Sequence, residues 1–272
     1  MKRTLEWQIA TVTAIKPETA EVKTLTVALP EWTAHRPGQH YDIRLTADDG
    51  YSAQRSYSIA SEPERRGEID LTVERVPDGE VSPYLLDTVV VGDRFEVRGP
   101  IGGYFVWDQS VGGPLLLVAG GSGVVPLMGM LRHRAAARIN APARLLYSAR
   151  AYEQIIYGPE LDMLAGQDGL KVSYTLTRAQ PPGWKGYARR VDDAMLAEVS
   201  KPLGPDTVAY VCGPTALVEV AADGLERVGF PADRIRTERF GPSGTWASRW
   251  TTSSSSTAMR QLARSPRSTA TT

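Results

Sequence analysis

The feature that most limits how this chain folds is a change of pattern at Val111-Gly112-Gly113. Before it, short Val- and Thr-rich runs are separated by turn signals, which is typical of a small antiparallel barrel. After it, apolar runs alternate with helical runs, which predicts a parallel sheet covered on both faces. We therefore expect a β-barrel domain over residues 1–108 and an α/β domain over residues 113–242.

The first half is expected to form six strands and one helix. Ser82 is a plausible N-cap for the helix, with Pro83 at its first position. The strands are expected at Gln8–Ile15, Glu21–Leu29, Tyr41–Leu45, Arg55–Ile59, Ile69–Arg75 and Arg94–Arg98, and the helix at Ser82–Asp87.

The second half is expected to alternate strands and helices up to a last strand, Ile235–Arg239. The other strands are expected at Leu115–Ala119, Leu145–Ser148, Val172–Thr177 and Val208–Cys212. The helices are expected at Val124–Ala137, Pro159–Leu164, Asp192–Val199 and Thr215–Val228.

Residues 243–272 have a different composition: 15 are Ser or Thr, four are Arg and none is acidic. Such a segment buries too little apolar surface to offset its ordering entropy, so a disordered tail is expected.

Charge and composition exclude several classes of function. The 31 basic and 31 acidic residues balance, which gives no electrostatic case for nucleic acid or an anionic membrane as a partner. The longest apolar run, Pro114–Ala119, is too short to span a bilayer, and no signal peptide is evident. The single cysteine, Cys212, excludes an intrachain disulfide and a protein-held iron–sulfur cluster, and the three histidines lack metal-ligand spacing. We expect a cytoplasmic protein without a catalytic metal.

The stretch Arg55-Ser56-Tyr57-Ser58 offers a cation for a phosphate, an aromatic plane for stacking and a hydroxyl for a ring heteroatom. Because side chains alternate along a strand, Arg55 and Tyr57 share one face and Ser58 takes the other. An ordinary strand with an exposed arginine would show the same four residues.

Three further segments carry the same kind of signal. Pro77–Pro83 is a glycine turn leading into a helix, which suits a phosphate or an ordinary helix cap. Leu115–Pro126 runs from a buried strand through Gly120-Gly121-Ser122-Gly123 into a helix, the arrangement of a dinucleotide site or of a tight packing turn. Tyr210–Pro214 ends a parallel strand, where its Gly-Pro turn would place Cys212 at the rim of a ligand crevice.

Taken together and in this order, these segments resemble the ferredoxin–NADP⁺ reductase superfamily over roughly residues 7–241. The nearest likeness is to reductases that serve Rieske-type oxygenases and similar multicomponent systems. The stretches that carry the resemblance are Arg36-Pro37-Gly38-Gln39, Arg55-Ser56-Tyr57-Ser58, Gly79-Glu80-Val81-Ser82, Gly99-Pro100-Ile101-Gly102, Gly120-Gly121-Ser122-Gly123, Cys212-Gly213-Pro214 and Glu238-Arg239-Phe240. Ser122 departs from the threonine usual in the family but keeps its hydroxyl.

The resemblance implies a bound flavin, with FAD favoured and FMN left open, and a role for each matched residue. Arg55 would hold the flavin phosphates, Tyr57 would stack on the flavin ring, and Ser58 would bond near its N5 atom. Phe240 would approach the ring from the opposite face. The other flavin-side residues implied are Ser56, Thr72, Val73, Arg75, Gly79, Val81 and Ser82. Those implied for the nicotinamide cofactor are Gly120, Gly121, Ser122, Ser148, Cys212, Gly213 and Pro214.

The choice between NADPH and NADH depends on the ends of two strands. Arg150 and Arg178 stand there and favour the 2′-phosphate of NADPH, because a guanidinium suits a phosphate. Glu153 leaves NADH as an alternative donor, and either arginine could equally be an ordinary solvent-exposed side chain.

The reaction expected from the resemblance is hydride transfer from NAD(P)H to the flavin, followed by single-electron transfer to a protein such as a ferredoxin or an oxygenase component. Tyr57, Ser58 and Cys212 would act in it by positioning. Two alternatives stay open: a reductase of free flavin or other small acceptors, and a non-catalytic chain that has lost a ferredoxin domain. Many relatives continue into such a domain after a segment like Glu238–Gly244.

Overall fold

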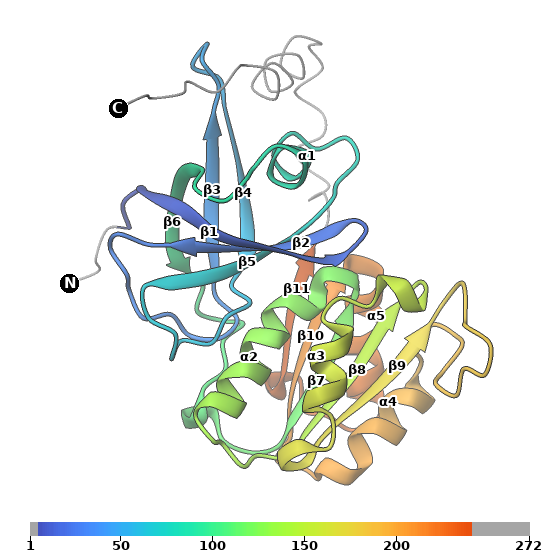
Figure 1. Ribbon diagram of the computed structural model, residues 1–272. Coiled ribbons are helices and arrows are strands. Elements are labelled where there is room, and N and C mark those ends of the chain that lie inside the picture. Colours follow the sequence, from blue (N-terminus) through green and yellow to red (C-terminus); the bar gives the residue numbers. More distant parts are fainter. Residues whose placement is uncertain (1–4, 241–272) are drawn as a thin grey trace.

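The computed structural model describes residues 5–240, which form two sheets, one above the other in Figure 1. The segment expected to be disordered, residues 243–272, lies outside the described residues. The upper sheet is antiparallel and the lower one is parallel and flanked by helices, so the predicted fold class is confirmed. We propose the connection between the two sheets as the domain boundary.

The upper sheet closes on itself into a small barrel. Its strands run in the order β4-β3-β6-β1-β2-β5, and a bridge between Ile59 and Leu71 joins the two ends of that order. Their inward side chains, among them Leu25, Ile43 and Val97, are fully buried. The strands are β1 Gln8–Thr19, β2 Val22–Ala28, β3 His40–Thr46, β4 Ser52–Ser58, β5 Glu68–Glu74 and β6 Arg94–Ile101.

A short helix, α1 (Val81–Asp87), follows β5 and begins one residue earlier than the sequence predicts. Ser82 is not its N-cap, so that prediction is wrong. The hydroxyl of Ser82 instead accepts a hydrogen bond of 3.0 Å from the backbone N–H of Val76, which closes the loop before the helix. This loop bond competes with capping for the same hydroxyl oxygen.

The lower sheet has five parallel strands in the order β11-β10-β7-β8-β9. They are β7 Leu115–Gly120, β8 Ala143–Ala149, β9 Leu170–Leu176, β10 Val208–Pro214 and β11 Ile235–Phe240. The helices are α2 Val124–Ala136, α3 Gly158–Leu164, α4 Asp193–Ser200 and α5 Thr215–Arg227. The predicted strands and helices of this half are confirmed, with ends that differ by one or two residues.

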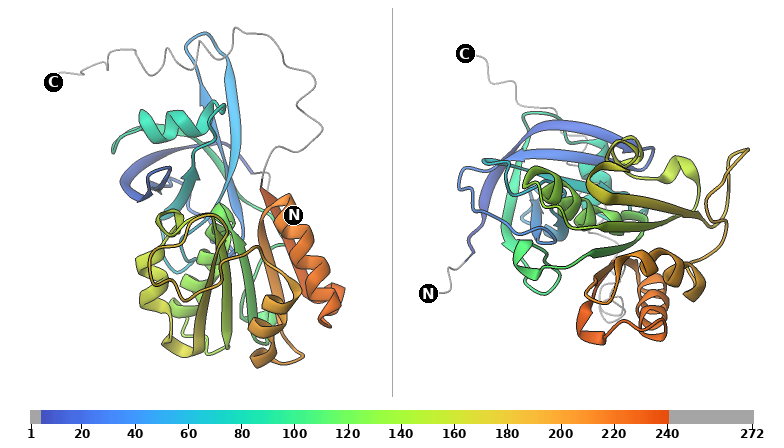
Figure 2. Two further views of the ribbon diagram at one scale, coloured as in Figure 1. Left: turned by 90° about the vertical axis from the view of Figure 1, so that its right-hand side faces the viewer. Right: turned by 90° about the horizontal axis from the view of Figure 1, so that it is seen from below.

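Alternation along the central strand divides the apolar side chains between two layers. Leu115 and Leu117 pack with α2 and α3, whereas Leu116 and Val118 pack with α4 and α5. All four side chains are fully buried, because a parallel strand covered on both faces leaves no polar side. Figure 2 shows the two helical layers on opposite faces of the sheet when the molecule is seen from below.

A polar contact centred on Arg132 of α2 joins the two sheets. Its Nε and Nη2 donate to the Glu160 carboxylate of α3 at 2.8 and 2.7 Å, and its Nη1 donates to the carbonyl of Ala60 in the barrel at 2.9 Å. Beside it, the hydroxyls of Tyr157 and Thr72 lie 2.5 Å apart, again across the boundary. Since the Arg132 side chain is only 15% exposed, these bonds are shielded from water.

Within residues 5–240, no helix is long and apolar enough to cross a membrane. In the same residues, no group of three or more His, Cys, Asp or Glu side chains is placed to hold a metal ion.

We expect Arg132→Ala to lower the free energy of unfolding by about 3 kcal/mol, because it leaves the Glu160 carboxylate and the Ala60 carbonyl without their donor. The measurement is urea unfolding followed by circular dichroism. Arg227→Ala is the matched control, since Arg227 makes a similar two-bond pair with Asp193 in solvent, 55% exposed. It should change stability little. Equal losses in the two variants would contradict a special role for the shielded pair.

Candidate functional site

A cavity of about 1500 Å³ lies between the barrel and the carboxyl ends of the parallel strands. Its walls come from the β1–β2 turn, β4, the β5–α1 loop, the glycine turn after β7, the ends of β8 and β9, the start of α5, and β11. A pocket for one drug-sized ligand typically has a volume of roughly 300–1000 Å³. The cavity therefore has room for more than one such molecule.

The barrel wall carries the stretch Arg55–Ser58, all four residues of which line the cavity. Tyr57 is partly buried, and burial raises the pKa of its phenol well above the usual value, so the ring stays neutral. Ser58 is 6% exposed, while Arg55 is exposed and donates only to the neighbouring Gln54 carbonyl, at 2.6 Å. A neutral aromatic plane thus stands beside a cation that has no acidic partner among the described residues.

His40 lies next to Ser58 and also lines the cavity. The two residues are directly paired across β3 and β4, so their side chains share one face of the sheet. Burial lowers the pKa of His40, with the Asp42 carboxylate opposing that shift. Within residues 5–240, the ring of His40 has no hydrogen-bond partner, which leaves both of its nitrogens available to a ligand.

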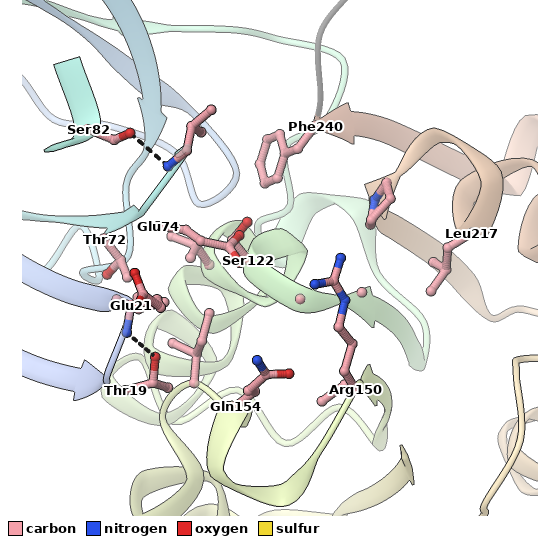
Figure 3. A pocket seen from close by; sticks show the side chains of 18 of the residues that line it. Thr19, Glu21, Thr72, Glu74, Ser82, Ser122, Arg150, Gln154, Leu217 and Phe240 are labelled. Carbon is pink, nitrogen blue, oxygen red and sulfur yellow. Dashed lines mark hydrogen bonds between the residues drawn. The ribbon is translucent and has the colours of Figure 1, made fainter. Parts of the chain in front are cut away.

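The β5 side of the cavity combines a fixed hydroxyl with a closed loop. Thr72 is held by the hydroxyls of Thr24 at 2.8 Å and Tyr157 at 2.5 Å. The loop after β5 is closed by the bond from Val76 to Ser82, drawn as a dashed line in Figure 3. Gly79, Val81 and Ser82 of this loop all line the cavity.

The turn after β7 brings backbone, rather than side chains, to the cavity. Gly121 has φ of +54°, a left-handed conformation that glycine adopts without strain. A Cβ on Gly123 would lie 2.1 Å from the carbonyl oxygen of Cys212, so no larger residue fits there. Gly120, Gly121 and Ser122 line the cavity at the start of α2. Such a turn lets a pyrophosphate approach the backbone N–H groups.

The ends of β8 and β9 present three arginines, Arg150, Arg178 and Arg190. In Figure 3, the guanidinium of Arg150 points into the cavity. The three side chains are exposed, and within the described part of the chain none of them makes an ion pair or a side-chain hydrogen bond. From the segment Ser148–Val191, Glu153 is the one carboxylate among the lining residues. This end of the cavity therefore has an excess of positive charge.

The last strand supplies a buried acid and an aromatic ring. Glu238 and Phe240 both line the cavity, and Figure 3 shows Phe240 directed into it. Burial raises the pKa of Glu238 to about 7. Its Oε2 atom is buried and has no hydrogen-bond partner among residues 5–240. A group of this kind can donate or accept one hydrogen bond to a bound molecule near neutral pH.

The structure corrects the expected position of Cys212. Its side chain is fully buried, does not line the cavity, and packs in the apolar layer under α2. The first turn of that helix, at Gly123, covers its carbonyl. Burial raises the pKa of the thiol well above its usual value. The sequence pattern places Cys212 at the end of a strand, but alternation turns its side chain to the covered face.

Three other expected residues also lie away from the cavity. The side chain of Val73 is fully buried in the barrel core. Arg75 pairs with Glu21 and Asp87, at 2.6 Å in each case, and its guanidinium is engaged outside the cavity. Gly213 lies against Gly120, beneath the turn. The remaining sixteen expected residues line the cavity: Arg55, Ser56, Tyr57, Ser58, Thr72, Gly79, Val81, Ser82, Gly120, Gly121, Ser122, Ser148, Arg150, Arg178, Pro214 and Phe240.

Sequence reasoning gave no role to His40, Arg190 or Glu238. Glu238 stands inside a stretch that carries the family resemblance, but in that stretch only Phe240 was assigned a role. His40 directly follows another such stretch. Arg190 has no signal of its own in the sequence, because its place in the cavity depends on how the segment after β9 folds back.

Two family models match the chain, one on each sheet. The oxidoreductase FAD-binding domain matches residues 9–106, and the oxidoreductase NAD-binding domain matches residues 117–223. The cofactors that these models describe are FAD and a pyridine nucleotide. The cavity lies between the two matched regions and contains residues of both.

Reductase components of oxygenase systems are similar to the chain. It is 32% identical to the glycine betaine monooxygenase reductase subunit of Chromohalobacter salexigens over 76% of its own length and 56% of that protein. It is 30% identical to the ferredoxin reductase component of 3-ketosteroid-9-alpha-monooxygenase of Rhodococcus rhodochrous over 85% of its own length and 64% of that protein. The chain thus spans less than two thirds of these curated relatives.

Solved structures show the same fold. An Amycolatopsis cytochrome P450 reductase superposes with a TM-score of 0.74 at 26% identity, covering 88% of this chain and 72% of that one. The cytochrome b5 reductase domain of Ulva prolifera nitrate reductase gives 0.73 at 26% identity, covering 86% and 97%.

The residues present fit FAD and a pyridine nucleotide. The glycine turn leaves its backbone accessible. Within residues 5–240, the side chains of Arg150, Arg178 and Arg190 have no acidic partner, and the Oε2 of Glu238 has no hydrogen-bond partner. A bound cofactor pair would supply partners for all of these groups.

The raised pKa of Glu238 should make the free energy of unfolding depend on pH. In the folded chain this carboxyl binds its proton up to a pH of about 7, whereas the unfolded chain releases it near 4.5. The folded state therefore holds more protons between these values, and its stability falls as the pH rises through this window, by up to about 3 kcal/mol. Glu238→Gln should remove this loss, so the free energy of unfolding of the variant, relative to that of the natural chain, should rise between pH 4.5 and 7.

Urea unfolding of the flavin-free protein at pH 5 and pH 7.5 measures this difference. Glu153→Gln, at an exposed position of the same cavity, is the control and should follow the natural chain. A constant difference between Glu238→Gln and the natural chain at both pH values would show that Glu238 ionises normally.

Proposed function

Because the chain belongs to the ferredoxin–NADP⁺ reductase superfamily, we propose that it is a flavoprotein reductase that uses NADPH and passes electrons to an acceptor protein. The observation that carries the proposal is the single cavity into which the flavin-side stretch Arg55–Ser58 and the glycine turn Gly120–Gly123 both open. Hydride transfer needs the two cofactor rings in contact, and one shared cavity allows that.

FAD, when bound, accepts the two electrons of a hydride and can release them one at a time. The protein residues bind, orient and shield. Tyr57 and Phe240 would supply the aromatic planes that support and shield the flavin ring. Ser58, which is paired with His40, would donate a hydrogen bond to the cofactor. Arg55 and the loop carrying Gly79, Val81 and Ser82 would hold its phosphates.

Glu238 would hold a proton at its carboxyl inside the cavity. Burial raises the pKa of this carboxyl to about 7, and within residues 5–240 its Oε2 atom has no hydrogen-bond partner, so it could bond to a bound cofactor. Cys212 is not part of this set, since its thiol is covered by α2. Its contribution is to pack beneath the glycine turn.

The preference for NADPH is supported by charge at the ends of β8 and β9. Arg150 and Arg178 line that end of the cavity and have no acidic partner within residues 5–240. A 2′-phosphate would neutralise them, whereas the ribose hydroxyl of NADH would leave them unpaired.

The acceptor that we propose is a ferredoxin or an oxygenase component, in the cytoplasm. The similar proteins are named as reductase subunits or components of monooxygenases, which supports this class of partner. The single cysteine of the sequence is in keeping with a reducing compartment.

The test is the visible absorption spectrum of the purified protein, followed by anaerobic addition of NADPH and, separately, NADH. A bound flavin that bleaches faster with NADPH is the expected result. Faster bleaching with NADH would overturn the donor preference alone. A colourless protein that takes up neither FAD nor FMN and oxidises neither donor would overturn the function.

We expect Tyr57→Ala to weaken flavin retention by about tenfold, because the variant loses the stacking plane and its buried area. The measurement is the ratio of flavin to protein after gel filtration, with the dissociation constant from fluorescence titration. Tyr57→Phe keeps the plane and should retain the flavin. Unchanged flavin content in Tyr57→Ala would refute the stacking role.

A further inference from the structure

Two ion pairs lie next to each other on the face of β3 and β6 that is turned away from the barrel core. His40, Asp42 and Arg44 alternate along β3, so their side chains share this face. Asp42 accepts a hydrogen bond of 2.8 Å from the Nη2 of Arg98 on β6. Arg44 donates to both carboxylate oxygens of Glu96, also on β6, at 2.8 and 2.5 Å. Two acids and two bases therefore neutralise each other in neighbouring pairs.

The indole ring of Trp7 covers both pairs, but the two acids differ in how far water reaches them. The centre of the ring lies 4.2 Å from the guanidinium carbon of Arg44 and 4.7 Å from that of Arg98. The side chain of Asp42 is 7% exposed, whereas that of Glu96 is 28% exposed. Because water screens a charge less where it is buried, the field of the Asp42 carboxylate extends further into the protein.

Of these two acids, Asp42 is the one that contacts the cavity wall. Its Oδ1 accepts a hydrogen bond of 2.6 Å from the hydroxyl of Ser56, which lines the cavity. His40 also lines the cavity, and the Asp42 carboxylate favours its protonated form, against the effect of burial on its pKa. The other pair stands further along the strands, where Arg44 lies opposite Gln54, a residue that does not line the cavity. The charge of Asp42 is therefore felt at the wall.

We propose that the Asp42–Arg98 pair sets the reduction potential of the flavin bound in the cavity, from behind the wall formed by Ser56 and His40. The inference rests on the proposed function. A hydride carries two electrons and one proton, so the group that accepts it gains one negative charge. A carboxylate behind the wall disfavours this gain and a guanidinium favours it, and the intact pair balances the two. Neither Asp42 nor Arg98 lines the cavity, so both are positioning residues.

The experiment measures the midpoint potential of the flavin by anaerobic spectroelectrochemical titration in Asp42→Asn, Arg98→Gln and the double variant. Asp42→Asn leaves the Arg98 guanidinium without its acid. We expect the ratio of reduced to oxidised flavin at a fixed potential to rise about tenfold, which is about 30 mV for a two-electron couple. Arg98→Gln leaves the carboxylate unpaired and should lower that ratio, and the double variant should lie between the two. Glu96→Gln, which breaks the other pair under Trp7, is the matched control and should keep the natural potential.

A second readout does not depend on the reaction of the flavin. The pKa of His40 is followed by NMR in the protein as purified, with its signal assigned by its absence from His40→Gln. Asp42→Asn should lower this pKa, because the protonated ring loses the carboxylate that favours it. Glu96→Gln should leave the pKa of His40 unchanged.

The results separate this inference from the proposed function. Unchanged potentials, shifts of the same sign in Asp42→Asn and Arg98→Gln, or an equal shift in Glu96→Gln would overturn the role of the pair while the reductase function stands. An unchanged pKa of His40 in Asp42→Asn would overturn it as well, because the charge would not reach the wall. A protein that binds no flavin overturns both proposals. An unchanged ratio of flavin to protein in each variant excludes a general loss of structure as the cause of a shift.

Discussion

The cavity lies between the barrel and the parallel sheet, and its shape depends on the contacts that hold the two together, among them those of the shielded Arg132 side chain. Its guanidinium is bound on one side by Glu160 and on the other by the Ala60 carbonyl, in a place that water hardly reaches. The hydroxyl pair of Tyr157 and Thr72 adds a second bond across the same boundary. Thr72 also lines the cavity, so the contact that joins the domains shapes the wall of the site.

The two halves contribute different kinds of groups to the site. The barrel offers side chains on strands, such as Tyr57 and Ser58, whose directions are fixed by the closed sheet. The parallel sheet offers backbone at the turn after β7, where Gly123 lets α2 start directly above β10.

The distribution of paired and unpaired charges follows the same division. Arg75, Arg132 and Arg189 are each neutralised by an acid within the chain, and none of them lines the cavity. Within the described part of the chain, Arg150 and Arg190 have no such partner, and both line the cavity. Glu238 is the opposite case, a buried acid that avoids the cost of an unpaired charge by keeping its proton up to a pH of about 7. Arg150, Arg190 and Glu238 thus bring unpaired polar groups to the same cavity.

The sequence by itself determined the two-sheet fold, because periodicity and turn residues are local signals and the change at Val111-Gly112-Gly113 separates them cleanly. The family resemblance that its motifs carry also pointed to sixteen of the residues that line the cavity. Which way a side chain faces, and which partner it meets, depends on packing between distant segments. Tertiary structure alone therefore decided that Cys212 is covered by α2, that Arg75 is paired with Glu21 and Asp87, and that Arg190 reaches the cavity along the edge of β9.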